Sequence, residues 1–438
     1  MARFLFCVWP APGHVYPSLP IARALRERGH DVAYVTYAEF EPVLRGFDVA
    51  YFPLRSRPSN PQTRQTPLRG ADARAIFRAL FILPASAMAR MIDRAADEFR
   101  PDVLVHDQRS FGPVLVAQRR GLPLATLAMT CCPLPGGDLA PFGLGLPPAA
   151  DEATRLRYAA MRRHAEDAYA PVLAEWNAIR AGFGLPPHAG PLATAAVSDR
   201  LLILPTVPEL DYNRADLPPR VRYVGPCTWD PPASLTPETA AWLASLPEAQ
   251  PLALVTASTA AVGPVPDRRS AALVEAAVAA LPEAGIAVLA TLPYDHPLHG
   301  IGSSPAVHIV RFAPHRSLLG RTSVAVTHGG FGIVSKAVQQ AVPLVVVPFA
   351  GDQPEVAQRV VASGVGRRLA PDALNPGRLH EAVGAVLQDP QYRANATRVA
   401  AAMALHDGPR EAAALLSDLA AHRAPISLKP ERNAEVTV

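Results

Sequence analysis

The chain has 438 residues, too many for one ordinary hydrophobic core and enough for two domains. Nearly half of its residues are apolar and only 18% are charged, so the composition excludes a disordered main body. The formal net charge is +4 and the arginines are scattered without a long basic run, which argues against nucleic acid as a partner.

The cysteines and the opening segment bear on where the protein works. Cys7, Cys131, Cys132 and Cys227 form neither a C-x-x-C pair nor a zinc-binding spacing, as expected of reduced thiols. The apolar run at residues 4–9 is too short for the core of a signal peptide and too short to span a bilayer. We therefore expect a cytoplasmic protein with no stable membrane insertion.

The first half of the chain alternates between apolar runs and amphipathic helices. A Gly/Pro turn leads into a helix that should begin near Pro17 and end at Gly29. A second copy of this pattern has a helix over residues 111–120 and a stop at Gly121. The expected strands, all apolar runs typical of strands covered on both faces, are residues 4–9, 32–35, 103–105 and 124–129. The alternation predicts an α/β fold with a parallel sheet.

The second half repeats this plan after a Pro-rich connection. Residues 211–250 carry prolines among charged residues, which indicates an exposed linker with a domain boundary near Gly225. Further strands are expected at residues 252–256, 286–290, 307–310, 324–326 and 344–347. We therefore predict a first domain over residues 1–224, a second over residues 225–422, and a disordered polar tail over residues 423–438.

Two long apolar segments, residues 51–100 and 131–195, show no regular period. Insertions of this kind on an α/β frame often build a binding pocket. Because these segments are apolar, the pocket should take a small, largely apolar molecule. The apolar candidates for its lining, in or beside these segments, are Phe81, Met88, Phe111, Met129 and Phe142.

The sharpest local signal lies at residues 324–332, where an apolar strand runs into the turn His-Gly-Gly-Phe-Gly and then a helix over residues 333–340. Glycines let the main chain approach a ligand closely, and the bare N–H groups of a first helical turn attract phosphate. His328 could donate a hydrogen bond to the same anion. The pattern predicts a diphosphate site, and a purely structural turn is the alternative.

The same region also resembles a dinucleotide-binding fingerprint. Gly330-x-Gly332-x-x-Ser335 is close to G-x-G-x-x-G, and Asp352 lies twenty residues further on, where a ribose-binding acid is expected. Against this, the third small residue is Ser, and Asp352 follows a Pro-Phe-Ala-Gly turn instead of a strand. A nicotinamide-dependent oxidoreductase is therefore the alternative function.

Two polar residues follow apolar strands of the first half. His14 comes after the first strand, and Asp107 comes after the strand at residues 103–105, so both should lie at one edge of one sheet. Histidine side chains in general change charge near neutral pH, so the imidazole could take a proton from an acceptor hydroxyl, with the carboxylate orienting it. The alternatives are a structural histidine and an aspartate that caps the following helix.

With these residues in place, the chain resembles the family 1 (UDP-glycosyltransferase-like) glycosyltransferases of the GT-B fold, in particular their bacterial natural-product branch. The Gly-His-Val-Tyr-Pro loop at residues 13–17 resembles the loop that carries the family's base. Residues 312–315, 328–332 and 348–353 resemble, in order, its donor-binding signature. The resemblance implies two facing Rossmann-like domains with parallel sheets and an interdomain cleft. The first domain would bind the acceptor and the second the nucleotide sugar.

The resemblance also implies roles for single residues. It makes His14 the base that deprotonates the acceptor, with Asp107 as its partner, and it implies inversion at the anomeric carbon. The donor-binding residues that it implies are Phe312 and Ala313 for the base, His328, Gly330, Phe331, Gly332, Ile333 and Thr259 for the diphosphate, and Asp352 and Gln353 for the sugar hydroxyls.

Three positions depart from the family pattern. Ile333 replaces the usual Ser or Thr, and Ser258 replaces a glycine. Lys336 stands where a glutamate normally accepts the ribose hydroxyls, although an ammonium group has no acceptor capacity. We expect Lys336 on a solvated helix face, with an approach to the diphosphate as the alternative.

No Asp-x-Asp sequence occurs in the chain, so we expect transfer without a metal ion and without a cofactor. The expected partners are a UDP- or dTDP-sugar donor and a small apolar acceptor, bound by a monomer or a homodimer. A catalytically silent nucleotide-sugar-binding helper is a further alternative, prompted by Lys336 and opposed by the presence of both His14 and Asp107. A sugar epimerase of the GT-B fold is one more alternative, but it would not need the apolar insertions.

Overall fold

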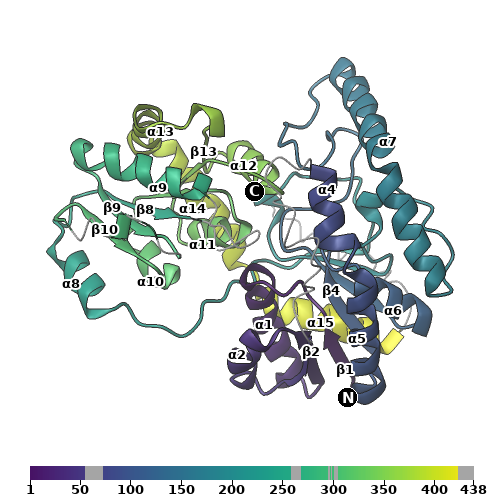
Figure 1. Cartoon of the computed structure of the whole chain (residues 1–438). Coiled ribbons are helices and arrows are strands. Elements are labelled where there is room, and N and C mark those ends of the chain that lie inside the picture. The colour runs from purple at the N-terminus through teal and green to yellow at the C-terminus, as the bar shows by residue number, and fades with distance from the viewer. Residues whose placement is uncertain (55–72, 258–267, 294–295, 297, 300–303, 423–438) are drawn as a thin grey trace, which may run out of the picture.

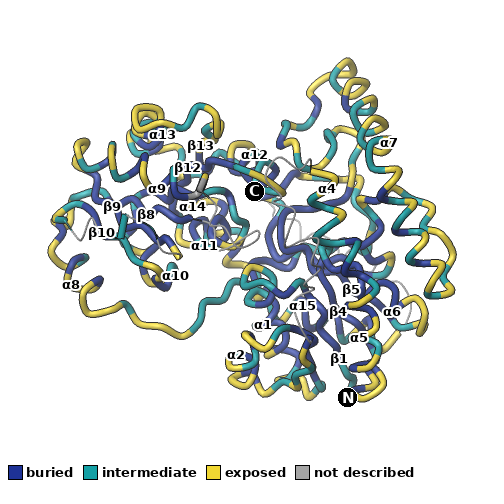
Figure 2. Tube along the Cα trace, viewed as in Figure 1, coloured by how far each residue is buried: buried dark blue, intermediate teal, exposed yellow. Residues whose placement is uncertain are grey.

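A computed structural model describes residues 1–54, 73–257, 268–293, 296, 298–299 and 304–422. The described chain forms two α/β units, each built on a parallel sheet with helices packed around it (Figure 1). The sheets are the most deeply buried part of each unit, and exposed residues gather on the outer helices (Figure 2). The predicted α/β architecture with parallel sheets is confirmed.

The first sheet has seven strands in the order β3-β2-β1-β4-β5-β6-β7. Its strands are β1 Arg3–Phe6, β2 Asp31–Thr36, β3 Ala50–Pro53, β4 Val103–Asp107, β5 Leu124–Leu127, β6 Leu201–Leu204 and β7 Val221–Tyr223. From β1 the chain builds outwards through β2 to β3, then returns to place β4 on the other side of β1. The carboxyl ends of β1 and β4 therefore flank the point where the strand order reverses, which is the usual ligand site of such sheets.

The second sheet has six strands in the order β10-β9-β8-β11-β12-β13 and repeats this plan. Its strands are β8 Leu252–Thr256, β9 Ala287–Thr291, β10 Val307–Val310, β11 Val324–Thr327, β12 Leu344–Val346 and β13 Gly366–Arg368. Here the order reverses between β8 and β11. The glycine turn that follows β11 thus lies at the switch point of its own sheet.

The helices of the first unit are α1 Pro12–Glu27, α2 Glu41–Arg45, α4 Ala73–Phe77, α5 Ala85–Phe99, α6 Gly112–Arg120 and α7 Glu152–Gly182. The helix expected near Pro17 begins earlier, because Pro12 fits the first helical turn, where no N–H is needed. The segments predicted to be irregular hold the long helices α5 and α7. A π-helical turn at Arg78–Ile82 and Pro171 inside α7 interrupt the regular helical spacing of apolar residues in these segments.

The helices that follow the linker are α8 Pro237–Ser245, α9 Arg268–Ala280, α10 His315–Leu319, α11 Phe331–Gln339, α12 Gln353–Ala362, α13 Pro376–Gln388, α14 Pro390–Ala404 and α15 Gly408–His422. The last of these returns to the first unit, where α15 lies against α1 (Figure 1). Leu416 and Leu419 of α15 are buried in the same cluster as Leu19 and Leu25 of α1.

This packing corrects the predicted extent of the second domain, residues 225–422. The segment of α15 belongs to the core of the first unit, so the chain crosses between the units twice. Sequence position alone could not show this, because the apolar face of a helix does not specify which core it joins. The predicted tail, residues 423–438, lies outside the described residues.

One stretch of the described chain, Ala73–Phe99, is long and apolar enough to cross a membrane by length and composition alone. Within it, Met88, Ile92 and Phe99 of α5 are buried in a core cluster with residues of the first sheet. These contacts are those of a core helix that packs on a sheet.

The docking of α15 should contribute directly to the stability of the first unit. Leu416→Ala removes a fully buried side chain and should lower the free energy of unfolding by about 2–5 kcal/mol. Leu405→Ala is the matched control, because Leu405 is 84% exposed and its truncation should change stability by less than about 0.5 kcal/mol. Urea unfolding measures both, and equal small effects would contradict the assignment of α15 to this core.

Candidate active site

His14 and Asp107 meet at the reversal point of the first sheet. His14 lies in the first turn of α1, directly after β1, and Asp107 is the last residue of β4. Because β1 and β4 are paired neighbours, both side chains reach the same edge, and His14 Nδ1 lies 3.0 Å from Asp107 Oδ2. The imidazole is 22% exposed, whereas the carboxylate is fully buried. The expected contact is therefore present.

The buried Asp107 carboxylate is held by several donors. The backbone N–H of Trp9 donates to Oδ2, and the N–H of Arg109 donates to Oδ1 at 2.7 Å. Burial by itself raises the pKa of this carboxyl, but the charge and hydrogen bond of His14 and the two amides outweigh burial and lower the pKa below its ordinary value. Asp107 is thus an anion at neutral pH that fixes the orientation of the imidazole.

Aromatic side chains stand beside this pair. The rings of Trp9 and Phe81 are 5.1 Å apart at their centroids, and Phe81 is only partly buried, as an acceptor-lining residue would be. Met88, Phe111 and Met129 are at most 9% exposed and pack in the core of the first unit. Packing accounts for their apolar character, and their role in acceptor binding stays a prediction.

The glycine turn of the second unit presents the start of α11. Gly330 immediately precedes this helix, which has no acidic residue in its first turn. A Cβ at Gly330 would lie 2.7 Å from His328 Nε2, so only glycine lets the imidazole lie against the turn. Gly329 has φ +91° and requires glycine for its conformation. Gly332 is exposed and Phe331 is partly exposed, while Ile333 is buried. The N–H groups of a first helical turn have no partner within the helix and favour an anion.

The remaining donor candidates have distinct environments. Phe312 is 55% exposed and could stack on a base, whereas its neighbour Ala313 is buried. Asp352 precedes α12 with a side chain that is 31% exposed. The Gln353 side chain accepts hydrogen bonds from the N–H groups of residues 349 and 350 through Oε1, so this oxygen shapes the turn before α12. Thr259 lies outside the described residues.

Arg109 joins the two halves of the site, and our reading of the sequence did not single it out. Its backbone N–H binds Asp107, while its guanidinium Nη2 lies 3.9 Å from Oδ1 of Asp352 in the second unit. The same guanidinium lies 5.3 Å from the centroid of the Phe81 ring. In the second unit, Gly329 of the glycine turn lies close to the backbone of Gln353, the residue after Asp352. The Arg109–Asp352 contact is therefore next to the glycine turn. The His14–Asp107 pair and the glycine turn therefore border the same junction between the units.

Lys336 does not lie on a solvated helix face, which corrects our expectation. Its side chain is only 17% exposed, and its Nζ forms an ion pair with Asp230 of the linker. The second oxygen of Asp230 accepts from the N–H of Arg316 at 3.4 Å. Burial, with Lys336 adding to it, lowers the pKa of nearby His315 to about 4, so this imidazole is neutral at pH 7.

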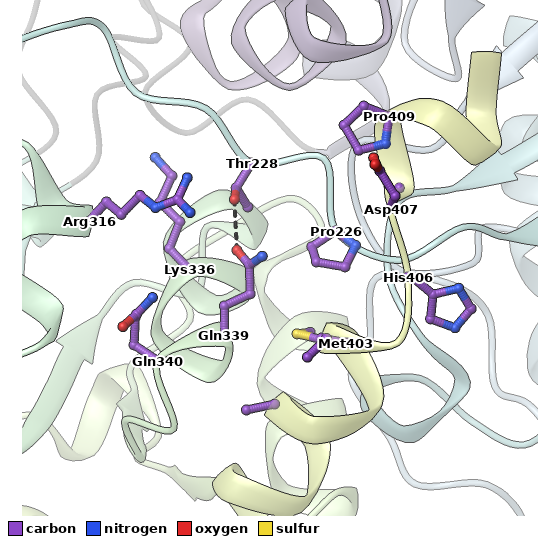
Figure 3. Close-up of a pocket in the computed structure, with 13 residues that line it drawn as sticks. Pro226, Thr228, Arg316, Lys336, Gln339, Gln340, Met403, His406, Asp407 and Pro409 are labelled. Atoms are coloured by element: carbon purple, nitrogen blue, oxygen red, sulfur yellow. Dashed lines mark hydrogen bonds between the residues drawn. The ribbon is translucent and has the colours of Figure 1, made fainter. Parts of the chain in front are cut away.

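A cavity of about 400 Å³ lies beside this ion pair, between the linker, α11 and the end of α14 (Figure 3). Its lining includes Thr228, Lys336, Gln339 and His406, and the hydroxyl of Thr228 donates to Oε1 of Gln339 at 2.7 Å. Within the described part of the chain, no group of three or more His, Cys, Asp or Glu side chains is arranged to hold a metal ion.

Known proteins are similar to this chain in both sequence and fold. The family described as "Erythromycin biosynthesis protein CIII-like, C-terminal domain" matches residues 275–419. The 4'-demethylrebeccamycin synthase of Lentzea aerocolonigenes is 32% identical over 428 residues, which cover 95% of this chain and 99% of that protein. The O-mycaminosyltylonolide 6-deoxyallosyltransferase of Streptomyces fradiae is 27% identical over 427 residues, which cover 94% and 96%.

Solved structures match over nearly the whole chain. CalG4, the calicheamicin glycosyltransferase, matches with a TM-score of 0.71 and 23% identity, covering 97% of this chain and 100% of that one. The spinosyn rhamnosyltransferase SpnG complexed with thymidine diphosphate matches with a TM-score of 0.67 and 20% identity, covering 95% and 99%. The fold is GT-B, as predicted. The chain belongs to the GT-B glycosyltransferases of family 1, in the branch whose members act in natural-product and antibiotic biosynthesis.

The lowered pKa of Asp107 predicts how stability depends on pH. Its carboxylate should contribute stability above the ordinary pKa of about 3.9 and lose that contribution as the pH falls through the lower pKa of the folded state. Asp107→Asn should therefore cost about 1–3 kcal/mol near pH 7, and the deficit should shrink below about pH 4. Urea unfolding across this range tests it, with the exposed carboxylate variant Asp97→Asn as control. A deficit that grows towards low pH would contradict the lowered pKa.

Proposed function

We propose that this glycosyltransferase transfers a sugar, with inversion, from a nucleoside-diphosphate donor to a hydroxyl group of a small apolar acceptor. The observation that carries the proposal is the contact of the partly exposed His14 with the buried Asp107, at the junction with the unit that bears the glycine turn. A base on one side and an anion-binding helix start on the other are the groups that such a displacement requires.

The proposed chemistry begins at His14. Its Nδ1 is bound to Asp107, so Nε2 is the nitrogen that accepts the acceptor's hydroxyl proton. The oxygen then forms a bond to the anomeric carbon while the bond from that carbon to the diphosphate oxygen breaks. The nucleoside diphosphate leaves with the bonding electrons, and the imidazolium is stabilised by the Asp107 anion. Attack from the side opposite the leaving group inverts the anomeric centre.

The leaving diphosphate would be stabilised by the start of α11 and by His328. The first-turn N–H groups and the positive end of the helix dipole favour an anion there. Arg109 adds a cation at the junction of the units, within reach of Asp352. The exposed Phe312 ring would stack on the base, and Asp352 would accept sugar hydroxyls.

The relatives and the local chemistry support particular donor and acceptor classes. SpnG, which shares the fold, is complexed with thymidine diphosphate, and this supports a dTDP-sugar, with a UDP-sugar as the second choice. The names of the relatives refer to the natural products rebeccamycin and tylonolide, and an apolar natural-product aglycone suits Phe81 beside the base. We further propose a monomer or homodimer that works in the cytoplasm without a metal ion or cofactor.

The alternative functions have less support. A nicotinamide-dependent oxidoreductase is not favoured, because the relatives and the fold neighbours are glycosyltransferases. A silent helper would not need a buried carboxylate that holds an imidazole at the ligand edge of the sheet. The ion pair of Lys336 with Asp230 gives the lysine a structural partner in the linker.

Replacing His14 tests the base directly. His14→Ala should lower transfer by at least about a hundredfold, because general base catalysis by a positioned side chain contributes ~10²- to 10⁴-fold. The affinity for dTDP and UDP, measured by calorimetry, should stay close to that of the parent enzyme. His164→Ala, on the exposed side of α7, is the control and should keep full activity. Unchanged turnover in His14→Ala would remove this residue from the mechanism.

Removing metal ions tests the proposed source of leaving-group stabilisation. Because protein groups replace a cation in this proposal, initial rates in excess EDTA should equal those in added Mg²⁺ within about twofold. The rates are measured with the same donor and acceptor in both buffers. Loss of transfer in EDTA that Mg²⁺ restores would refute this part of the proposal.

A further inference from the structure

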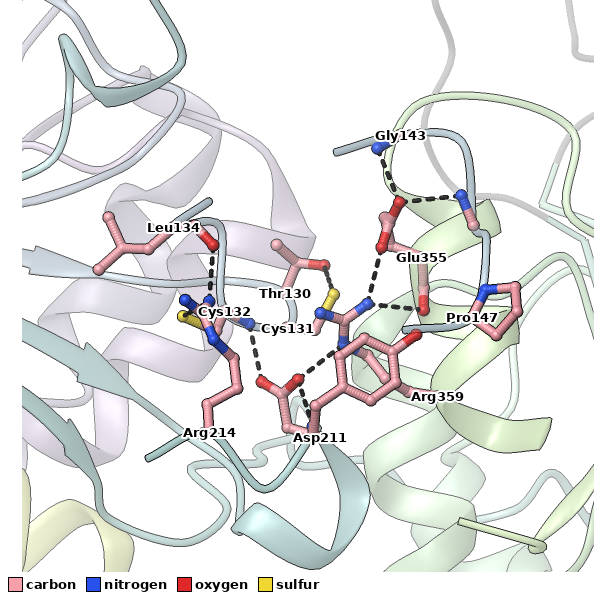
Figure 4. A network of polar contacts seen from close by, with 12 residues as sticks. Thr130, Cys131, Cys132, Leu134, Gly143, Pro147, Asp211, Arg214, Glu355 and Arg359 are labelled. Atoms are coloured by element: carbon pink, nitrogen blue, oxygen red, sulfur yellow. Dashed lines mark hydrogen bonds and ion pairs between the residues drawn. The ribbon is translucent and has the colours of Figure 1, made fainter. Parts of the chain in front are cut away.

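A buried ionic network joins the two units beside the proposed active site (Figure 4). Asp211 belongs to the first unit, whereas Glu355 and Arg359 belong to α12 of the second. Arg359 donates from Nε to Asp211 Oδ1 and from Nη1 to Glu355 Oε2, both at 2.7 Å. None of the three side chains is more than 8% exposed.

Glu355 also holds a loop of the first unit, residues 141–147, which we call the 141–147 loop. Its second oxygen, Oε1, accepts the backbone N–H groups of Gly143 and Gly145, each at 2.9 Å (Figure 4). The carbonyl of Gly145 accepts from Arg368 at 2.7 Å. Gly145 has φ +59°, and a Cβ there would lie 2.2 Å from the carbonyl oxygen of Pro354. The loop therefore lies directly on the first turn of α12.

The loop contact depends on charge compensation. A buried carboxylate is costly unless its lone pairs are satisfied, and Glu355 satisfies them with one guanidinium and two loop amides. Asp211 is satisfied in turn by Arg359 and by the N–H of Cys132 at 2.9 Å. Loss of the loop amides would leave Glu355 with an unsatisfied buried oxygen, so the loop has one strongly preferred position.

The 141–147 loop and α12 each belong to one side of the proposed reaction. The loop carries Phe142 and Leu144, which are 38% and 44% exposed, in the insertion expected to bind the acceptor. The helix begins at Gln353, next to Asp352, where donor sugar hydroxyls are expected. Glu355 lies within one helical turn of both residues, so a shift of this turn on donor binding must move the anchor of the loop.

We propose that Glu355 is a positioning residue that couples occupation of the donor site to the placement of the 141–147 loop against the acceptor. This inference rests on the proposed function. Arg359 and Asp211 hold the carboxylate in place across the unit boundary. Donor binding at the start of α12 secures the loop, and the acceptor then meets Phe142 and Leu144 in their final positions.

Two variants separate the loop contact from the stability of the network. Glu355→Ala removes the anchor but leaves the pair of Arg359 with Asp211. Gly145→Ala keeps all charges and displaces the loop, because its Cβ would overlap the Pro354 carbonyl. Glu381→Ala, which loses an exposed pair with Arg378 on α13, is the matched control.

Hydrogen exchange of the peptide over residues 139–147 is measured with and without dTDP-glucose and UDP-glucose, together with the Kd of each nucleotide sugar. In the parent and the control, the bound donor should slow exchange in this peptide. In both loop variants, exchange should be at least about tenfold faster and insensitive to the donor. Because coupling between two sites is reciprocal, the donor Kd of these variants should rise by up to the factor by which the bound donor slows exchange in the parent. Transfer is assayed with 4-methylumbelliferone, or with quercetin if the parent does not turn over the first. The acceptor KM of the loop variants should rise by about tenfold, and by more than the donor KM.

The outcomes separate this inference from the proposed function. A parent protein that binds neither nucleotide sugar overturns the proposed function and this inference with it. A parent that binds the donor, with loop variants whose exchange still responds as in the parent, overturns only the role of Glu355. Faster exchange in Glu355→Ala with parental behaviour in Gly145→Ala also overturns it, because the loop contact would then not be the cause.

Discussion

The site depends on one buried anion, the carboxylate of Asp107. It lies at the end of β4 without solvent contact, and two backbone amides and one imidazole compensate its charge. Without these donors, burial would favour the neutral acid, which could not orient His14 in the same way. The strand order makes the arrangement possible. The order reverses between β1 and β4, and this reversal makes the two strands neighbours.

The two units share a plan, and they contribute opposite halves of the chemistry. In each sheet the functional segment follows a strand at the reversal point, with His14 in one unit and the turn after His328 in the other. Contacts across the boundary bring these segments to one junction. The pair of Arg109 with Asp352 lies beside the catalytic groups. The network around Arg359 is more deeply buried, with none of its three charged side chains more than 8% exposed.

The boundary between the units is held by polar contacts, by a returning helix, and by the apolar residues Cys131, Val207 and Leu210, which pack into the core of the second unit. Helix α15 ties the end of the described chain back to α1, so the second unit is connected to the first at both of its ends. Buried ion pairs are sensitive to geometry, because an unpaired charge in a dry environment is costly. An interface of this kind favours one relative placement of the units over many, which suits a reaction between two substrates held on opposite sides.

The sequence by itself determined the α/β architecture, most strand positions and the pairing of His14 with Asp107. These follow from local rules, since apolar runs form buried strands and polar residues after parallel strands gather at one edge. Only the tertiary structure decided that α15 joins the first core, that Lys336 pairs with Asp230, and that Arg109 and Glu355 bridge the units. Each of these contacts joins residues far apart along the chain, and no local period or spacing encodes which distant partner a charged side chain or an apolar helix face will meet.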